Sequence, residues 1–223
     1  MFLSKQQEYW NGRYSAEGAL WGGNPCLAAT RAAGVFKANG ARKILVPGCG
    51  YGRNSSYLAA QGFQVSAFDI SDEAIELAKE MAEEKALSVE YRHADVLEVE
   101  IHDTFDGILS INMLHLFDEK NRNRILEKFQ GILNKGGILV LTSMSVNDPD
   151  FGKGEMVGPN TYESKKGRPV YYFDTKSIKE LFLKYFSEVE VEEIREYENH
   201  GGKEHYHNMM YVVGLKLMQY WHY

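Results

Sequence analysis

The stretch "ILVPGCGYGRNSSYLAAQGF", at positions 44–63, joins an apolar run to three glycines at alternate positions. The apolar run is typical of a short buried strand, and a helix is expected to begin near Arg53. At the turn between them, Gly48, Gly50 and Gly52 carry no Cβ, so a ligand can approach the backbone more closely than at other residues. The stretch therefore predicts a ligand-binding turn at the carboxyl end of a strand.

Strand and helix signals alternate along the chain from about Lys43, which is the pattern of a parallel sheet with crossover helices. Ser71, Asp118 and Asp174 suit the N-cap positions of three later helices. The last two strands are joined by a short polar stretch, so they should pair antiparallel. Strands are expected at 43–47, 63–69, 87–93, 105–111, 138–144, 187–197 and 208–216. The sequence thus predicts an α/β fold with a doubly wound, mostly parallel seven-stranded sheet and an antiparallel C-terminal hairpin strand.

The composition is that of an ordinary globular protein, with 44% hydrophobic and 25% charged residues. Lys and Arg number 25 against 31 Asp and Glu, so the net charge of −6 gives no general attraction to nucleic acid or anionic lipid. The first residues lack the order of a signal peptide, and no apolar run is long enough to span a bilayer. Cys26 and Cys49 do not indicate a disulfide framework. We expect a cytoplasmic protein with neither nucleic acid nor a membrane as partner.

The glycine turn differs from the two common phosphate-binding motifs. A dinucleotide fingerprint would place its third glycine where Arg53 stands, which counts against NAD or FAD. A P-loop would end in Gly-Lys-Ser or Gly-Lys-Thr, and the turn does not. What remains is a cofactor that contains a nucleoside but whose charged part is not a pyrophosphate. A tight turn without a ligand is the alternative interpretation of the three glycines.

The segment VPGCGYG, at 46–52, resembles motif I of the class I S-adenosylmethionine-dependent methyltransferases. The resemblance continues through Asp69, which ends the second strand, and through HADV after the third, so it covers about 43–144. It implies a Rossmann-like fold and S-adenosylmethionine as cofactor, with Asp69 binding the ribose hydroxyls and Asp95 and Val96 holding the adenine. A carboxylate suits the ribose, because it accepts two charge-assisted hydrogen bonds. A helix N-cap for Asp69 and a turn residue for Asp95 are the alternatives.

Two further stretches narrow the resemblance. GRNSSYLAAQGF at 52–63 and ILSINMLHLF at 108–117 are similar to stretches of the tellurite-resistance branch, with the thiopurine methyltransferases as a second similar branch. WGGNP at 21–25 fits the wider small-molecule group. The resemblance implies methyl transfer to a small-molecule acceptor, with a thiol or a chalcogen oxyanion as candidates, by a monomer or homodimer. The implied cofactor-binding residues are Trp10, Trp21, Gly48, Cys49, Gly50, Gly52, Asp69, Ile70, Asp95, Val96, Ser110 and Ile111.

We expect one domain over 1–223 that carries added segments around its cofactor-binding half. The expected parts are a helical and aromatic cap at 1–40, a cofactor-binding half at 43–144, a substrate lid loop at 145–172, and a C-terminal helix with strands at 173–223. Asn24 and Pro25 suit the N-cap and first turn of a helix in the cap. The lid reads as neither helix nor strand, which is unusual at this length. Trp10 and Trp21 are as consistent with ordinary packing as with a cover over the cofactor.

The sequence contains no clear catalytic dyad, and methyl transfer from a sulfonium needs none, because positioning supplies much of the rate. His115 follows the fourth expected strand and is the candidate base for a hydroxyl or amine acceptor, with a buried structural histidine as the alternative. Lys165, Lys166 and Arg168 are most simply a solvated stretch of loop. A non-catalytic sensor or partner protein that binds S-adenosylmethionine or a nucleoside is the alternative function.

Three histidines, His200, His205 and His207, fall in the expected loop between the last two strands, and such a group can bind zinc. Without a cysteine or a firm ligand spacing, an exposed polar loop is the simpler interpretation. Contact with the acceptor is a third. We therefore expect no metal site.

Overall fold

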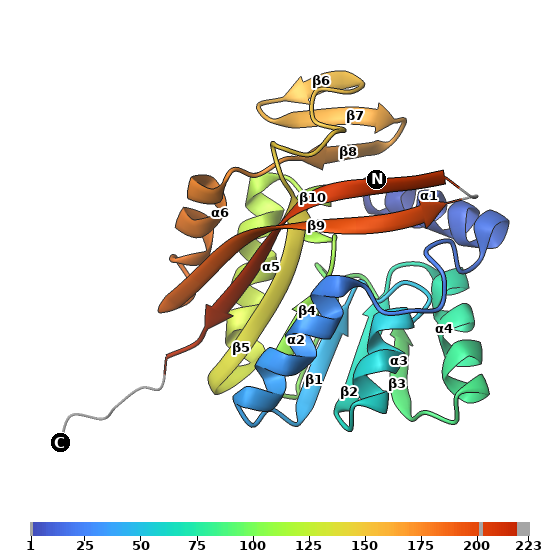
Figure 1. The fold of residues 1–223 in the computed structure, drawn as a ribbon, viewed down its shortest axis with the longest axis vertical. Helices are drawn as coiled ribbons and strands as arrows, with labels where there is room; N and C mark the ends of the chain where they lie inside the picture. The colour runs from blue at the N-terminus through green and yellow to red at the C-terminus, as the bar shows by residue number, and fades with distance from the viewer. Residues whose placement is uncertain (1, 201–202, 218–223) are drawn as a thin grey trace.

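One large sheet with helices on both faces forms the centre of the protein, and the computed structural model describes residues 2–200 and 203–217 (Figure 1). Its strands are β1 (Lys43–Pro47), β2 (Gln64–Asp69), β3 (Val89–His93), β4 (Phe105–Ser110), β5 (Leu133–Met144), β9 (Glu188–His200) and β10 (Lys203–Leu215). Their order is β3-β2-β1-β4-β5-β10-β9. β10 pairs antiparallel with β5 and β9, whereas the other neighbours pair parallel. The expected fold class is confirmed.

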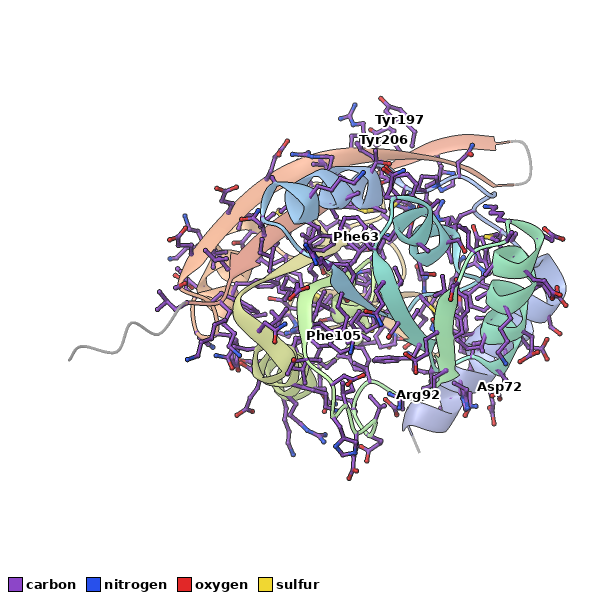
Figure 2. All side chains as sticks on the ribbon, turned by 90° about the horizontal axis from the view of Figure 1, so that it is seen from below. Phe63, Asp72, Arg92, Phe105, Tyr197 and Tyr206 are labelled. Atoms are coloured by element: carbon purple, nitrogen blue, oxygen red, sulfur yellow. The ribbon has the colours of Figure 1, made fainter. Side chains whose placement is uncertain are left out.

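The helices cover the two faces of this sheet in separate groups. They are α1 (Phe2–Glu17), α2 (Leu27–Ala38), α3 (Arg53–Ala60), α4 (Asp72–Glu84), α5 (Glu119–Ile132) and α6 (Thr175–Phe182), with a short 3₁₀ turn η1 (Leu114–Leu116). Side chains of α2, α3 and α4 pack with Ile44 and Val46 on one face, and those of α5 and α6 pack with Leu45 on the other. Alternate residues of a strand point to opposite faces, so one apolar run supplies both layers. Figure 2 shows Phe63 and Phe105 inside the molecule, one in each layer.

The starts of the helices follow their capping residues. The caps expected at α4, α5 and α6 are present as Ser71, Asp118 and Asp174. The expected start of α2 was wrong, because Asn24 and Pro25 lie before the helix and Cys26 is its N-cap. The Cys26 N–H donates to Asn54 Oδ1 at 3.0 Å and its Sγ accepts the Ala29 N–H, which keeps the backbone extended up to this residue. Among the helices of 2–200 and 203–217, none is long and apolar enough to cross a bilayer.

The segment 145–172 is not the loop that the sequence predicted. It contains β6 (Glu155–Gly158), β7 (Thr161–Lys165) and β8 (Arg168–Tyr171), which form a small antiparallel sheet. Turns at Asn160 and Gly167, both at positive φ, connect the strands. These strands are short and pair only with one another, so their sequences show too little alternation of apolar and polar residues to be recognised as strands. In Figure 1 this sheet lies at the top, beyond the end of the large sheet.

The C-terminal hairpin is longer than expected. β9 runs to His200 and β10 starts at Lys203, so His205 and His207 lie in a strand and not in a loop, which corrects the prediction. The side chain of His200 lies outside the described residues. The residues of this arm are polar and charged, so the hydrophobic pattern that marks a strand is missing there, while the backbone ladder continues regardless of side-chain type.

Candidate active site

The glycine turn after β1 has a left-handed backbone at each of its glycines. Gly48, Gly50 and Gly52 have φ values of +65°, +54° and +85°. A Cβ at Gly48 would lie 3.0 Å from Met113 Sδ, and a Cβ at Gly50 would lie 2.7 Å from Tyr14 Oη. Both positions face a cavity, so glycine keeps the backbone accessible there.

Gly52 has a different environment. A Cβ at this position would lie 2.6 Å from Tyr91 Oη and 2.9 Å from the Ala78 Cβ, which belong to β3 and α4. Gly52 is also the N-cap of α3 and does not line the cavity. The third glycine therefore allows α3, α4 and β3 to pack closely.

Asp69 ends β2 with its carboxylate directed at the glycine turn. Its Oδ2 accepts the Gly50 N–H at 2.8 Å and its Oδ1 accepts the Ser71 N–H at 2.9 Å. The side chain is buried, and burial raises the pKa of Asp69 against the opposing effect of these hydrogen bonds. Burial also raises the pKa of the neighbouring Cys49 thiol, as does the charge of Asp69. Cys49 is therefore held as a neutral thiol, which agrees with assigning it no nucleophilic role.

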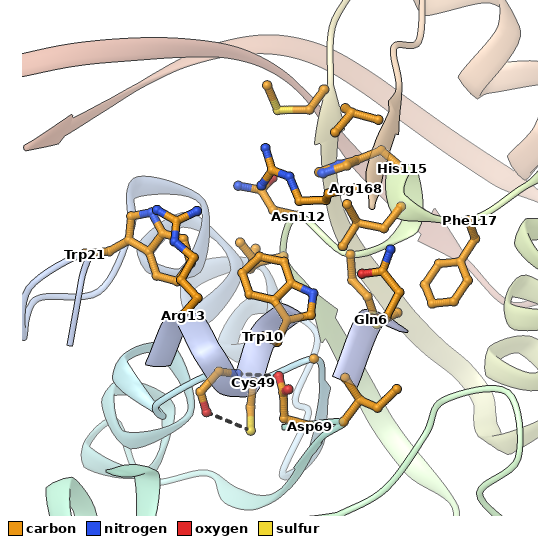
Figure 3. A pocket seen from close by; sticks show the side chains of 18 of the residues that line it. Gln6, Trp10, Arg13, Trp21, Cys49, Asp69, Asn112, His115, Phe117 and Arg168 are labelled. Carbon is orange, nitrogen blue, oxygen red and sulfur yellow. Dashed lines mark hydrogen bonds between the residues drawn. The ribbon is translucent and has the colours of Figure 1, made fainter. Parts of the chain in front are cut away.

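A cavity of about 320 Å³ lies at the carboxyl ends of β1, β2 and β4, with residues of α1 and β8 on its other side. Figure 3 shows Asp69 and Cys49 at one end of it, Arg168 and His115 at the other, and Trp10 between them. Of the predicted cofactor-binding residues, those that line it are Trp10, Trp21, Gly48, Cys49, Gly50, Asp69, Ile70, Asp95, Val96 and Ile111. Ser110 is fully buried within β4 and, like Gly52, does not line it.

The loop after β3 reaches the cavity through Asp95 and Val96. Asp95 Oδ1 accepts the Leu97 N–H at 2.8 Å, so the residue does form the local turn that its alternative interpretation suggested. Lys128 of α5 donates from Nζ to the carbonyls of Val96, Leu97 and Val99, at 2.8, 3.0 and 3.0 Å. This ammonium group ties the loop to α5.

Aromatic rings from α1 and the glycine turn pack together beside the cavity. Trp10 stacks on Tyr14 with 5.9 Å between centroids, and Trp21 stacks on Tyr51 with 6.0 Å and an interplanar angle of 9°. Tyr51 donates a hydrogen bond to the Gly22 carbonyl and accepts one from the Trp21 N–H. Trp10 and Trp21 thus pack with other rings and also line the cavity. Ordinary packing and a position over a bound ligand are therefore compatible for these two residues.

His115, in η1, lies at the far end of the cavity from Asp69. It is 5% exposed, and its Nδ1 has no hydrogen-bond partner among the described residues. Burial, with smaller contributions from the charges of Arg168, His207 and Arg122, lowers the pKa of His115 to about 3. A neutral imidazole with so low a pKa is a weak general base.

Positive charges gather around the same end of the cavity. Arg168 of β8 is half-buried, with a buried Nε that has no hydrogen-bond partner within the described part of the chain. Lys165 of β7 lies at the rim, and burial and the charges of Arg13 and Arg168 lower its pKa. The expectation of a solvated stretch holds for Lys165 and Lys166, which are exposed. It was wrong for Arg168, which β8 places half-buried beside the cavity.

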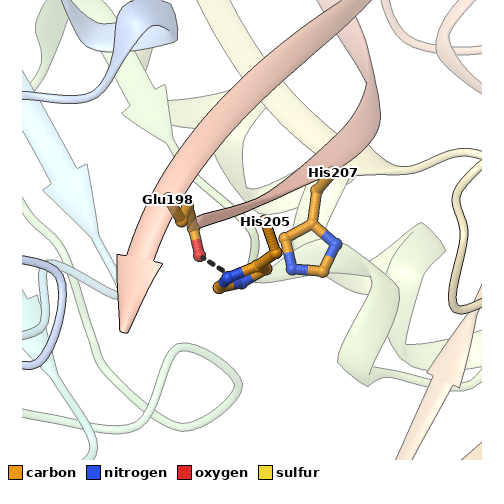
Figure 4. Close-up of side chains that lie close together, drawn as sticks. All are labelled: Glu198, His205 and His207. Carbon is orange, nitrogen blue, oxygen red and sulfur yellow. Dashed lines mark ion pairs between the residues drawn. The ribbon is translucent and has the colours of Figure 1, made fainter. Parts of the chain in front are cut away.

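The β9–β10 arm brings a third group of side chains to the cavity. Glu198 Oε2 lies 3.8 Å from His205 Nε2 (Figure 4). His207 Nδ1 lies 3.0 Å from Asp148 Oδ2. Glu198, His205 and His207 all line the cavity.

Comparison with known proteins places this geometry in a family. Residues 44–137 match the family model for a methyltransferase domain, and this range contains the glycine turn, Asp69 and Asp95. Residues 44–137 therefore carry a domain of the methyltransferase family. Over 107 residues this chain is 30% identical to the probable S-adenosyl-L-methionine-dependent methyltransferase TehB of Haemophilus influenzae (strain 10810). Over 146 residues it is 30% identical to the glycine/sarcosine N-methyltransferase of Aphanothece halophytica.

The sequence alignments cover a smaller part of the chain than the structural superposition does. The two alignments cover 48% and 63% of this chain, and 37% and 51% of the two relatives, so the chain spans about half or less of their length. A protein solved in work on the conversion of a disulfide bond into a thioacetal group during echinomycin biosynthesis superposes with a TM-score of 0.72 and 18% identity. That superposition covers 97% of this chain and 93% of the other. At such identity the likeness shows the fold alone.

One relative is described as S-adenosyl-L-methionine-dependent, and solved neighbours hold S-adenosylmethionine or S-adenosylhomocysteine. The residues of this protein fit this cofactor. Gly48 and Gly50 present bare backbone that a side chain would obstruct, and Asp69 presents a buried carboxylate with acceptor capacity beyond its two backbone donors.

Sequence reasoning missed four residues of the site. Tyr14 lies one helical turn after Trp10, and this spacing was the available signal. Asn112 lies two residues after the end of β4, lines the cavity and has φ of +53°, a strained conformation that often occurs at functional sites. Lys128 and Arg168 carried no signal, because the segments that they contact, at Val96 and at Tyr9, are distant in sequence.

Proposed function

We propose that this protein transfers a methyl group from S-adenosylmethionine to a small anionic acceptor, with a thiolate or a chalcogen oxyanion as the acceptor class. The observation that carries the acceptor class is the half-buried Arg168, whose Nε has no hydrogen-bond partner among the described residues, in the cavity that also contains Gly50 and Asp69. When bound, the cofactor supplies a sulfonium methyl that is already activated toward nucleophiles.

The chain's own residues divide the binding work along the cavity. Gly48 and Gly50 let the methionine part lie against the backbone, and Asp69 accepts the ribose hydroxyls with a carboxylate already oriented by two N–H groups. Asp95 and Val96 hold the adenine, in the loop fastened by Lys128. Hydrogen bonds within the protein hold Asp69 and the Val96 loop in place without the cofactor, so these groups are preorganised for binding.

The other end of the cavity favours an acceptor that needs no base. The pKa of His115, lowered to about 3 mainly by burial, makes it a poor acceptor for the proton of a hydroxyl or an ammonium. A thiolate or an oxyanion carries its nucleophilic lone pair without such help. Arg168 and Lys165 attract such an anion, and the guanidinium can hold it through fixed N–H groups. Orientation then supplies most of the rate.

The segments 1–40 and 145–172 provide the walls that exclude water in this proposal. α1 contributes Gln6 and Trp10 to the cavity and β8 contributes Arg168, so the two segments close the acceptor end from different sides. Acceptor choice would therefore reside in them.

The experiment measures cofactor affinity and turnover separately. Calorimetry with S-adenosylhomocysteine should show a loss of about 1.5–3 kcal/mol for Asp69→Ala, the scale of a lost hydrogen bond to a charged group. Incubation with S-adenosylmethionine and a panel of thiols, tellurite, selenite, halides and small amines should release S-adenosylhomocysteine with the anionic acceptors. Arg168→Ala should raise KM for the acceptor at least tenfold, about 1.4 kcal/mol, without changing cofactor affinity. Lys166→Ala, at an exposed position beside it, is the matched control.

Turnover with the amines alone, or an unchanged acceptor KM in Arg168→Ala, would contradict the acceptor class. Binding of S-adenosylhomocysteine without turnover on any acceptor of the panel would support the non-catalytic alternative.

A further inference from the structure

The arm formed by β9 and β10 carries two histidines and a glutamate on one face. His205 and His207 are two residues apart in β10, so their side chains point to the same side, and Glu198 of β9 is the cross-strand neighbour of His205. One ligand atom from each of the three lies within 4.8 Å of the other two. All three line the cavity, and Figure 4 shows their side chains converging.

His207 is oriented by a carboxylate on its other side. Asp148, whose side chain is fully buried, lies 3.0 Å from His207 Nδ1 and also accepts the Asn208 N–H at 2.8 Å. An Nδ1–H that donates to Asp148 leaves Nε2 as the ring atom with a lone pair. This is the carboxylate–histidine arrangement that commonly fixes the ring of a metal ligand.

We propose that Glu198, His205 and His207 bind a divalent zinc-like metal ion, with Asp148 as a positioning residue for His207. Imidazole nitrogen and carboxylate oxygen are suitable donors for such an ion. Ligand bonds of about 2.0–2.2 Å in a tetrahedral site place donor atoms roughly 3.5 Å apart, so the three side chains need to close by only about 1 Å. Three protein ligands leave a position open toward the cavity, as in catalytic zinc sites.

A second group of possible ligands overlaps with this one. Asp148, Asp150 and His207 also have atoms within 4.8 Å of one another. Asp148 Oδ2 is already committed to His207 and Asn208, and Asp150 Oδ1 is paired with Lys153 Nζ at 2.8 Å. Asp148 therefore serves as the partner of His207 in this proposal, and Asp150 is a test of the choice.

The consequence for catalysis rests on the proposed function. A metal ion at this position would bind the sulfur or oxygen of the acceptor and lower its pKa, so that the acceptor proton is released to solvent on binding. In the transfer, the acceptor lone pair forms the new bond to the methyl carbon. The bond from that carbon to the sulfonium sulfur breaks, and its electron pair stays on the sulfur. The ion would thus select thiols and oxyacids over amines.

The test measures zinc binding directly. Protein freed of metal with a chelator is titrated with ZnCl₂ by calorimetry and with CoCl₂ by visible absorption, which reports the ligand set. We expect one zinc ion per chain, and a loss of affinity of at least about tenfold in Glu198→Gln and His207→Gln. Asp148→Asn should lose about 10–100-fold, the usual cost of removing such a partner. Asp150→Asn and the exposed His102→Gln are matched controls and should bind zinc as the unchanged protein does.

S-adenosylhomocysteine affinity and the melting temperature of each variant show whether it is folded. If Asp148→Asn does not fold, the Glu198→Gln and His207→Gln variants still decide the question. The side chains of Glu198 and His207 are more exposed than that of Asp148, and glutamine is close in size to glutamate. Zinc affinity that is unchanged in both, or no zinc binding by the unchanged protein while S-adenosylhomocysteine binds, overturns the metal site and leaves the proposed function intact. Zinc binding without any cofactor binding supports the metal site and contradicts the proposed function.

Discussion

The two ends of the cavity differ in how their polar groups are satisfied. At the cofactor end, Asp69 accepts two backbone N–H groups, and Lys128 fastens the neighbouring loop through three carbonyls. At the acceptor end, Gln6 Oε1, His115 Nδ1 and Arg168 Nε are buried without a hydrogen-bond partner in the described part of the chain. The polar groups at the cofactor end are hydrogen-bonded within the protein. Those at the acceptor end are left available for a ligand.

This difference has an energetic meaning. A buried polar group without a partner costs about 1–3 kcal/mol, so the acceptor end reduces stability in exchange for groups that can meet a ligand. At the cofactor end both carboxylate oxygens of Asp69 have a backbone donor, and the open positions are glycines, so less of this cost arises there. Substitutions should therefore affect cofactor affinity at one end, and turnover or acid stability at the other.

The largest effect is expected at the glycine turn. In Gly50→Ala the new Cβ would lie 2.7 Å from Tyr14 Oη at a φ of +54°, so the backbone that donates to Asp69 and lines the cavity must shift. We expect S-adenosylhomocysteine affinity to fall about 100-fold, or about 2.7 kcal/mol, by calorimetry. Gly40→Ala, at a φ of +68° with open space around it, carries the same backbone strain away from the cavity and should keep its affinity. Equal losses in both variants would mean that strain alone is responsible.

A smaller effect concerns acid stability at the other end. Because burial lowers the pKa of His115 to about 3, the folded state keeps this imidazole neutral while the unfolded chain takes up a proton below about pH 6.5. The free energy of unfolding is therefore not reduced by His115 above pH 6.5, and it decreases as the pH falls from 6.5 toward 3. At pH 5 the loss should be about 2 kcal/mol relative to pH 7.5.

Urea unfolding at the two pH values measures this difference. His115→Gln removes the titrating group, so its stability should fall about 2 kcal/mol less between pH 7.5 and pH 5 than that of the unchanged protein. His102→Gln, at an exposed position, is the control. The same pH dependence in all three proteins would show that His115 does not titrate as its burial implies.

The small β6–β8 sheet should affect turnover and not cofactor affinity. A Cβ at Gly154 would lie 2.4 Å from the Glu163 carbonyl oxygen in β7, so Gly154→Ala must displace the β6–β7 hairpin. We expect turnover to fall about tenfold, with S-adenosylhomocysteine affinity within about threefold of the starting value. Gly152→Ala has a similar φ of +83° but open space, and should leave both unchanged. A parallel loss of cofactor affinity would show that the two ends are not independent.

The smallest effect is expected at the adenine loop. Lys128→Met keeps the apolar stem but removes the three hydrogen bonds to the loop that carries Val96. S-adenosylhomocysteine affinity should fall about threefold to tenfold, because the loop is loosened while its contacts remain available. Lys120→Met, at an exposed position on the same helix, is the control for loss of charge. Unchanged affinity in Lys128→Met would limit this lysine to a structural role.

The sequence by itself determined the fold and predicted most of the residues that line the cavity around Asp69. The alternation of strands and helices and the turn with Gly48 and Gly50 are local patterns, and a local pattern can be read without knowing what lies opposite. Three helix starts were predicted for the same reason, since a cap and its N–H partner are three residues apart. Gly52 and Ser110 are next in sequence to residues that line the cavity, but they do not line it themselves. Whether such a residue faces a ligand or a neighbouring helix depends on how the elements pack, which local sequence does not show.

Only the tertiary structure decided the acceptor end. Gln6, His115, Arg168 and His207 come from four distant segments, and none lies in a periodic pattern that distinguishes it from a surface residue. Arg168 was expected in solvent because its neighbours are polar. It is half-buried because β8 pairs with β7 and faces α1 across the cavity. The environment of a charged side chain is set by the elements that pack against it. The contact of Arg168 with Tyr9 of α1 joins residues more than a hundred positions apart, beyond the reach of local sequence patterns.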